Sequence, residues 1–187
     1  MRPKEIAGST LAVIGLGSIG LPLAQHARAL GMHVMAVREH SERGPGSAHE
    51  VFGPAELDSV LSRSDFVILA APVTSRTEHL ITAPRLARMQ RRAVLINIAR
   101  GSLIDESALL DALRNQNIGG AALDVFEDEP LPADSEFWRL PNVMITPHTA
   151  GLTDKMWERQ YELLADNLRR YLAGQQLCNV VDKRSGY

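Results

Sequence analysis

Several features that mark particular classes of protein are scarce in this sequence. Cys178 is the single cysteine among 187 residues, so the chain cannot form an internal disulfide and offers no set of thiolates for a zinc site. No apolar run approaches the length that crosses a bilayer, and no charged and then apolar leader precedes the first predicted strand. Acidic and basic residues are interspersed and leave a net charge of −2, which does not indicate a nucleic-acid partner. We therefore expect a cytoplasmic protein that binds no membrane, no nucleic acid and no metal.

The apolar segments that the sequence does contain alternate with helical patterns. Apolar residues make up 45% of the chain and charged residues 22%, which is typical of one globular domain with at most an appendage. The predicted strands, all nearly continuously apolar, are residues 11–14, 33–37, 66–70, 93–98, 121–125 and 143–145. The predicted helices are residues 18–30, 54–62, 83–88, 106–115 and 154–173, and residues 41–49 are expected to form a loop. Such strands are typical of a parallel sheet covered on both faces, so we predict a doubly wound α/β fold, the Rossmann fold.

The last predicted helix carries an apolar stripe. Its members recur at helical spacing and are Trp157, Tyr161, Leu164, Leu168 and Leu172. Periodicity leaves two interpretations open, because the stripe could pack on the chain's own sheet or dock on another domain or chain. We expect residues 1–151 to form a nucleotide-binding domain and residues 152–187 to form this long helix and a tail.

A glycine-rich turn follows the first predicted strand and opens the first predicted helix. Its sequence is Gly15-Leu16-Gly17-Ser18-Ile19-Gly20. In a dinucleotide-binding unit the first glycine permits a tight turn, the second lets the backbone approach a pyrophosphate, and the third lets helix and strand pack closely. Amide hydrogens and the helix dipole then hold the phosphates. The motif alone also occurs in ordinary turns, but the strand, helix and second strand at the expected spacing favour dinucleotide binding.

Arg38 stands at the end of the second predicted strand, where NAD-binding units usually carry an acidic residue. A guanidinium cannot accept hydrogen bonds from the two ribose hydroxyls of NAD, but it can pair with the 2′-phosphate of NADP. Ser41 and Arg43 are close enough in sequence to join the same site. The alternative is that Arg38 is a solvated surface cation and that the neighbouring Glu39 binds the sugar. The sequence favours NADP over NAD and leaves both open.

Three further motifs each follow a predicted strand. Arg100 follows the fourth strand, Glu129 the fifth, and His148 the sixth. Because the carboxyl ends of parallel strands line the ligand-binding edge of such a sheet, we expect a guanidinium, a carboxylate and an imidazole to meet there. Each residue alone has an ordinary explanation, as a surface cation, a solvated loop acid or a loop histidine. Three complementary groups at successive strand ends favour a functional site.

These three groups suit hydride transfer between an alcohol and a nicotinamide. Histidine titrates in the range that lets it take the hydroxyl proton in oxidation and return it in reduction. A neighbouring carboxylate would stabilise the imidazolium and fix its tautomer. An arginine beside the carbonyl would hold a substrate carboxylate and polarise the oxygen as charge develops. The set predicts a redox enzyme rather than a simple binding protein.

Five motifs, in order, carry a resemblance to a known family. They are GLGSIG, PVTSRTEHLI, NIARGSLIDESAL, GAALDVFEDEPLP and ITPHTAG, within a stretch from Ile6 to Asp182. The chain resembles the D-isomer-specific 2-hydroxyacid dehydrogenases, which include phosphoglycerate dehydrogenase, glyoxylate/hydroxypyruvate reductases, D-lactate dehydrogenases and formate dehydrogenase. The resemblance implies an NAD(P)-dependent oxidoreductase that acts on a small 2-hydroxy or 2-keto acid.

The resemblance also implies roles for particular residues. Arg100 would bind the substrate, Glu129 would pair with the histidine, and His148 would donate and accept the proton. Asp124 would contact the nicotinamide carboxamide, and the backbone of residues 72–74 would pass near the cofactor. The complete set implied for cofactor binding is Gly15, Gly17, Ser18, Ile19, Gly20, Arg38, Ser41, Arg43, Ala71, Pro72, Thr77, Ile98, Ala99, Arg100, Asp124, His148 and Ala150. Arg38 replaces the family's usual acid, as the NADP-preferring members often show.

Members of this family build their substrate domain mostly from an N-terminal segment, whereas this chain begins at Met1 almost directly before its first predicted strand. We therefore expect a missing substrate lobe supplied in trans, or a homodimer, with the stripe of the last helix meeting the partner. Two functions stay open: the oxidoreductase, and an NAD(P)-binding or interaction module without turnover, as the family's transcriptional corepressors suggest. The strand-end residues disfavour methyl transfer from S-adenosylmethionine on the same fold.

Overall fold

The computed structural model of the protein describes residues 4–184 and 186. The chain divides into two compact units, Met1–Pro147 and His148–Tyr187. The first unit holds the sheet and the second holds the last helix and the tail. Our sequence prediction drew the boundary after residue 151, and the expected contact of the last helix with a missing lobe or a partner stays a prediction.

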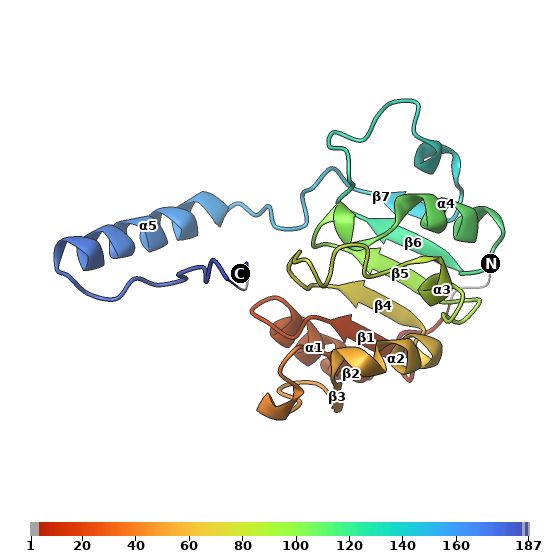
Figure 1. The fold of residues 1–187 in the computed structure, drawn as a ribbon, viewed down its shortest axis with the longest axis horizontal. Coiled ribbons are helices and arrows are strands. Elements are labelled where there is room, and N and C mark those ends of the chain that lie inside the picture. Colours follow the sequence, from red (N-terminus) through yellow and green to blue (C-terminus); the bar gives the residue numbers. More distant parts are fainter. Residues whose placement is uncertain (1–3, 185, 187) are drawn as a thin grey trace. The chain divides into compact units, whose positions relative to one another are not determined.

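The first unit is built on a parallel sheet (Figure 1). Within the described residues it has seven strands in the order β3-β2-β1-β4-β5-β6-β7, each paired in parallel with its neighbours. The strands are β1 Thr10–Ile14, β2 His33–Val37, β3 Glu50–Phe52, β4 Phe66–Leu69, β5 Val94–Asn97, β6 Gly120–Leu123 and β7 Val143–Ile145. The order reverses between β1 and β4, which is the switch point where such sheets bind ligands. The doubly wound α/β fold predicted from the sequence is confirmed.

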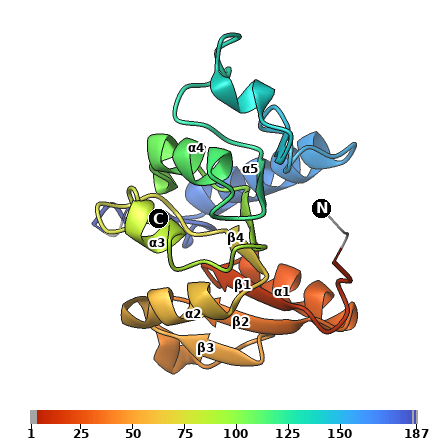
Figure 2. The ribbon, with the colours of Figure 1, turned by 90° about the vertical axis from the view of Figure 1, so that its right-hand side faces the viewer.

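Helices cover both faces of this sheet (Figure 2). They are α1 Gly20–Ala29, α2 Leu57–Arg63, α3 Ala83–Leu86 and α4 Glu106–Arg114, and short 3₁₀ turns span Ser41–Arg43, Pro54–Glu56, Gly101–Leu103 and Glu136–Arg139. Figure 2 shows α2, α3 and α4 on one side of the strands and α1 on the other. Successive strand residues enter different cores, so Val13 packs with Ala24 of α1, whereas Ile14 packs with Leu61 of α2.

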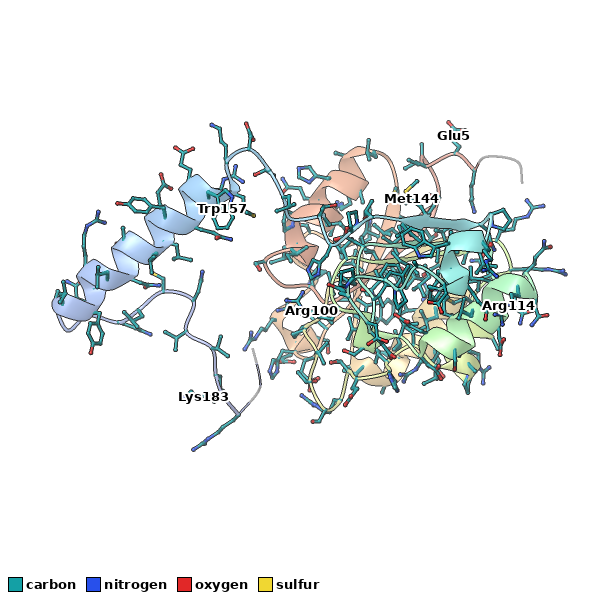
Figure 3. All side chains as sticks on the ribbon, turned by 90° about the horizontal axis from the view of Figure 1, so that it is seen from above. Glu5, Arg100, Arg114, Met144, Trp157 and Lys183 are labelled. Carbon is teal, nitrogen blue, oxygen red and sulfur yellow. The ribbon has the colours of Figure 1, made fainter. Side chains whose placement is uncertain are left out.

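Coverage of the sheet is uneven on the α1 face. Helix α1 packs against β1 and β2. At the far edge, Val143 and Ile145 of β7 pack on the core of the opposite face. Met144 lies between them, points to the α1 face and is 68% exposed (Figure 3). The expected two-sided coverage therefore holds over β1 and β2, while at Met144 the described part of the chain leaves the sheet open to solvent.

Among the described strands, β3 is the one that sequence reasoning missed. It has three half-buried residues at the sheet edge, and Met35 of β2 pairs with Glu50. A strand this short shows too little alternation to be recognised from periodicity. The predicted strands and helices are all present, with ends that differ by at most three residues. The largest difference is at α2, where the 3₁₀ turn Pro54–Glu56 takes the place of the predicted first turn.

The second unit begins at His148 and contains α5, Met156–Leu172, and the tail that follows it. The tail is tied to this helix, because the Cys178 N–H donates to Asn167 Oδ1 at 2.7 Å and Asn167 Nδ2 donates to Cys178 O at 3.2 Å. The predicted stripe lies on the helix and is exposed at Trp157, Tyr161, Leu164, Leu168 and Leu172. Across the described residues, no helix combines the length and apolar character needed to span a membrane.

Asp105 caps α4, and its removal should measurably destabilise the fold. Its Oδ1 accepts the Ala108 N–H at 3.0 Å and the Ser107 hydroxyl at 2.7 Å. These bonds hold the pKa of Asp105 below its ordinary value of 3.8. We expect Asp105→Ala to lower the free energy of unfolding by about 1 kcal/mol near neutral pH, and Asp105→Asn, which keeps an acceptor, to lower it less.

The pH dependence of this effect has a definite sign. The contribution of a carboxylate with a lowered pKa is fully present above the ordinary value of 3.8 and is lost as the pH falls through the lowered one. Urea unfolding of the three proteins at about pH 7 and about pH 3 measures both effects. An alanine variant as stable as the parent near neutral pH would show that the cap contributes nothing.

Candidate functional site

The glycine turn lies at the carboxyl end of β1, between the ends of β2 and β4. Gly15 has φ 101° and donates its N–H to Val37 O at 2.8 Å. A Cβ at Gly15 would lie 2.6 Å from the backbone nitrogen of Ala71, and a Cβ at Gly20 would lie 2.0 Å from Gly15 O. The packing of the protein itself therefore requires the first and third glycines of the motif.

Internal packing does not require glycine at position 17, the middle glycine of the motif. A Cβ built there would meet no described atom within 4 Å, and its φ is outside the left-handed region. Helix α1 takes its first turn here, with Leu21 N–H donating to Gly17 O at 2.9 Å. The amides of Ser18, Ile19 and Gly20 come before that bond and have no helical carbonyl to bind. Bare backbone beside first-turn amides fits the pyrophosphate of a dinucleotide.

The end of β2 carries charged residues of both signs. Arg38 is half-buried and donates its backbone N–H to Phe52 O at 3.1 Å. Glu39, the residue that could bind the sugar in place of Arg38, forms an ion pair with Arg76, at 2.6 Å between Oε1 and Nη1. The two other residues predicted for this region, Ser41 and Arg43, form the ends of the 3₁₀ turn Ser41–Arg43. The Arg76 partner was not foreseen from the sequence.

The loop after β4 is a compact turn beside Gly15. Ala71 is buried where that glycine packs against its backbone. Thr77 donates its hydroxyl to Pro72 O at 2.7 Å, and the Thr74 N–H donates to Thr77 Oγ1 at 2.8 Å. Three of the residues predicted for cofactor binding, Ala71, Pro72 and Thr77, therefore lie in one turn next to the glycine motif.

The loop after β5, which includes Ile98 and Ala99, is shaped by a buried asparagine. Asn97 has no exposed surface, donates its Nδ2 hydrogen to Arg100 O at 2.8 Å and accepts the Ala99 N–H at 3.1 Å. Arg100 is exposed and donates from Nη1 to Ala99 O at 2.6 Å. Figure 3 shows Arg100 and Arg114 at opposite ends of this unit. Asn97 was not among the predicted site residues, although a polar amide ending an apolar strand was a visible signal.

The loop after β6 packs directly on the loop after β5. A Cβ at Gly101 would lie 1.9 Å from the carbonyl carbon of Phe126, so the two backbones touch. Asp124 is buried and accepts the Thr146 hydroxyl at 2.5 Å. Glu129 is exposed, and its Oε1 accepts the Phe126 N–H at 3.0 Å. The loops that carry the predicted guanidinium and carboxylate are thus packed together.

The loop after β6 also joins a group of charged residues that the sequence did not reveal. His79 Nε2 lies 3.0 Å from Glu127 Oε1, and the Glu127 N–H donates to Glu106 Oε1 at 2.7 Å. Burial raises the pKa of Glu106, the charges of Glu127 and Asp128 raise it further, and the hydrogen bond from the Glu127 backbone opposes them. His79 lies in the loop after β4, Glu127 and Asp128 lie in the loop after β6, and Glu106 begins α4, so sequence spacing could not connect them.

His148 and Ala150 belong to the second unit. His148 opens that unit, three positions after Ile145 ends β7, and is exposed with φ 53°. Its position in the chain agrees with the expected placement after the last strand. The meeting of His148 with Arg100 and Glu129 stays a prediction.

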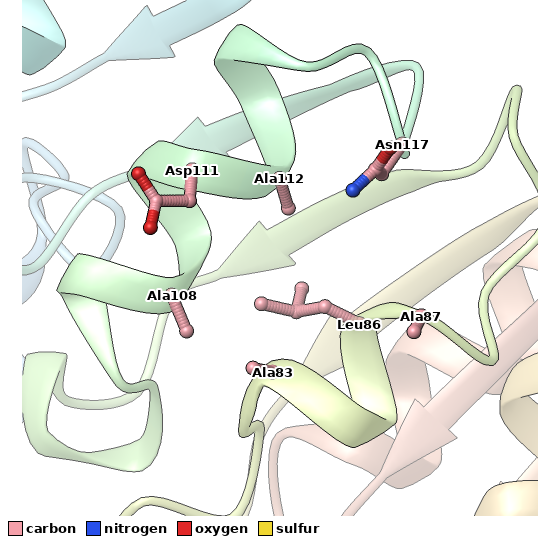
Figure 4. A pocket seen from close by; sticks show the side chains of 7 residues that line it. All are labelled: Ala83, Leu86, Ala87, Ala108, Asp111, Ala112 and Asn117. Carbon is pink, nitrogen blue, oxygen red and sulfur yellow. The ribbon is translucent and has the colours of Figure 1, made fainter.

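A small pocket lies in the helical layer rather than at the strand ends (Figure 4). Figure 4 shows Leu86 of α3 directed toward Ala108 and Ala112 of α4. The other residues that line the pocket are Ala83, Ala87, Asp111 and Asn117. None of the residues predicted for catalysis or cofactor binding lines it.

Three features define a Rossmann domain of the dinucleotide-binding class: the strand order, the glycine turn at the switch point, and Gly17, which no internal contact requires to be glycine. Residues 1–150 match the family model described as D-isomer specific 2-hydroxyacid dehydrogenase, NAD binding domain. The chain therefore belongs to this family, as the five sequence motifs indicated.

Similarity to known proteins extends over nearly the whole chain. A glyoxylate reductase of Korarchaeum cryptofilum is 37% identical over 187 residues, which cover 98% of this chain and 55% of that protein. The NADPH-dependent glyoxylate/hydroxypyruvate reductase of Sinorhizobium meliloti, solved with NADP and sulfate, is 34% identical with a TM-score of 0.91, covering 100% of this chain and 60% of that one. The D-lactate dehydrogenase of Lactobacillus jensenii, solved with NAD⁺, is 31% identical with a TM-score of 0.85, covering 97% and 58%. The chain spans about half the length of the curated relatives it matches.

The raised pKa of Glu106 predicts how this site affects stability. A carboxyl whose pKa is raised above its ordinary 4.5 binds a proton more readily in the folded chain. Its ionisation therefore costs stability as the pH rises from about that value. Glu106→Gln keeps an acceptor for the Glu127 N–H and removes the charge.

We expect Glu106→Gln to be more stable than the parent near neutral pH, by up to about 1 kcal/mol, with the gain fading toward pH 4. Urea unfolding between about pH 4 and about pH 7 measures the difference, and Glu78→Gln on an exposed position of the loop after β4 is the control. A Glu106→Gln variant that is no more stable than the Glu78→Gln control at neutral pH would contradict the expectation.

Proposed function

We propose that this chain is the cofactor-binding part of an NAD(P)-dependent oxidoreductase that interconverts a small 2-hydroxy acid and the corresponding 2-keto acid. The observation that carries the proposal is Gly17, whose missing side chain serves no contact inside the described protein but leaves room for a pyrophosphate. Two relatives named as glyoxylate or glyoxylate/hydroxypyruvate reductases support the substrate class.

In this proposal each strand-end residue has one task. Bound NAD(P) would supply or accept the hydride. Asp124 would hold the nicotinamide carboxamide, and Arg100 would bind the substrate carboxylate and polarise the neighbouring carbonyl oxygen. His148 would give a proton to that oxygen in reduction and take it back in oxidation. Glu129 would fix the imidazole tautomer and stabilise its charged form.

We further propose a preference for NADP over NAD. Arg38 supplies a guanidinium at the end of β2, where a 2′-phosphate would lie, and Glu39 is held by Arg76. Relatives solved with NADP and with NAD⁺ both occur, so the family accommodates either cofactor.

The substrate site would need further residues to close over the cleft and exclude water. We propose that a substrate lobe, in the same polypeptide or in a partner, supplies them, because the curated relatives are about twice as long. The homodimer and the cytoplasmic location predicted from the sequence stay predictions.

The cofactor preference is tested with NADPH and NADH titrated separately by their fluorescence. We expect the parent to bind NADPH more tightly, because charge-assisted bonds between Arg38 and the phosphate contribute roughly 1.5–3 kcal/mol, or about 10- to 100-fold in affinity. Arg38→Asp should reverse the order. Arg91→Asp, the same charge change at an exposed turn before β5, should leave it unchanged. An unaltered preference in Arg38→Asp would remove Arg38 from the proposal.

The proton-transfer role is tested by reduction of glyoxylate or hydroxypyruvate with NADPH. His148→Ala should lower the rate by roughly 100-fold or more, because a positioned acid contributes that much. His26→Ala, an exposed histidine on α1, is the control. A rate retained in His148→Ala would exclude the histidine as the proton donor. With the substrate lobe present in the assay, NADPH binding without any turnover by the parent would instead favour the module that binds the cofactor only.

A further inference from the structure

An ion pair joins the ends of two strands on either side of the glycine turn. Glu39 follows Arg38 directly at the end of β2, and Arg76 lies in the loop after β4, 37 positions further along the chain. The Arg76 Nη1 to Glu39 Oε1 distance is 2.6 Å, and the two side chains are 69% and 37% exposed. An exposed pair of this kind contributes little to the stability of the fold. Its main effect is therefore on the charge near the end of β2.

The strand order fixes where this pair lies. Strands β2 and β4 flank β1, whose carboxyl end carries Gly15. The Gly15 N–H binds Val37 O on one side, and the Gly15 backbone packs on Ala71 on the other. The pair between Glu39 and Arg76 therefore links the two loops that border the glycine turn, at the edge where a Rossmann domain receives the adenosine part of its cofactor.

Arg76 is presented by an ordered turn rather than by a loose loop. Its backbone N–H donates to Thr74 Oγ1 at 3.3 Å, and Thr77 links the Thr74 N–H to Pro72 O. The turn contacts the glycine motif through Ala71. The guanidinium is thus anchored close to the end of β2 before any ligand arrives.

An unpaired carboxylate at Glu39 would affect both cofactors, in opposite directions. A carboxylate beside the ribose accepts hydrogen bonds from the two hydroxyls of NAD, as the acid of NAD-binding units does. The same carboxylate repels the 2′-phosphate of NADP. An ion pair with Arg76 occupies the carboxylate and cancels its charge, while the guanidinium keeps further N–H donors for other acceptors.

We infer that Arg76 is a cofactor-specificity residue, which favours NADP by neutralising Glu39 beside Arg38. This inference rests on the proposed binding of NADP at this site and names a second guanidinium that the preference requires. Arg38 would contact the phosphate, and Arg76 would act chiefly through Glu39.

A double-mutant cycle on binding tests the inference without any need for turnover. Fluorescence titration gives the ratio of the NADH and NADPH dissociation constants for the parent, Arg76→Ala, Glu39→Gln and the double variant. We expect Arg76→Ala to shift this ratio about tenfold toward NADH, a coupling typical of neighbouring charges. In the Glu39→Gln background the same substitution should shift the ratio by less than about twofold, because no carboxylate remains to be released.

Two controls define the charge dependence. Arg88→Ala removes an exposed arginine between α3 and β5 and should leave the ratio unchanged. Arg76→Lys keeps the charge and should retain most of the parent preference. The Arg76→Ala effect should also shrink in high salt, because exposed charges are screened.

The outcomes separate this inference from the proposed function. A parent that binds neither dinucleotide contradicts the proposed function itself. A parent whose NADPH preference depends on Arg38, together with an Arg76→Ala ratio equal to that of Arg88→Ala, overturns only the role of Arg76. An equal shift in the presence and absence of the Glu39 carboxylate also overturns it, because Arg76 would then act independently of Glu39.

Discussion

At the carboxyl end of β1, the glycine turn, the start of α1 and the loop after β4 lie so close together that no Cβ would fit at Gly15 or Gly20. Side-chain atoms at Gly15 or Gly20 would overlap the backbone of Ala71 or of Gly15 itself, so strand, turn and helix can close only around glycine. This closure brings the first-turn amides of α1 to the switch point between β1 and β4. The remaining glycine of the motif, Gly17, is free of that constraint, and it is the position where the surface stays bare.

A similar contact organises the other half of the sheet edge. Gly101 lets the loop after β5 touch the loop after β6 at Phe126, and Asn97 ties the first of these loops to the backbone of Arg100. Glu129 is held in the second loop by the Phe126 N–H. Polar side chains at this edge are thus supported by nearby backbone groups, which gives a defined starting geometry to residues that lie on loops.

The sequence was most informative where the physics is local or periodic. Apolar runs, the glycine spacing and helical stripes predicted the sheet and every helix, while β3 was too short to show a period. The sequence could not predict contacts between loops, because the pairs Glu39–Arg76 and His79–Glu127 join residues 37 and 48 positions apart. Candidate residues at strand ends could be named from topology, but their partners depend on side-chain directions that no spacing rule contains.

The two guanidinium groups assigned to cofactor choice and substrate binding should act independently. Arg38 directly follows β2 and Arg100 follows β5, with β1 and β4 between these strands. Neighbouring strands lie about 4.8 Å apart, so the two strand ends are separated by about 14 Å. This exceeds the screening length of about 8 Å at physiological ionic strength. In the proposed mechanism, a change of charge at the end of β2 would therefore alter the preference between dinucleotides and leave the field at the substrate carboxylate nearly unchanged. Cofactor binding and turnover would then report on separate parts of that mechanism.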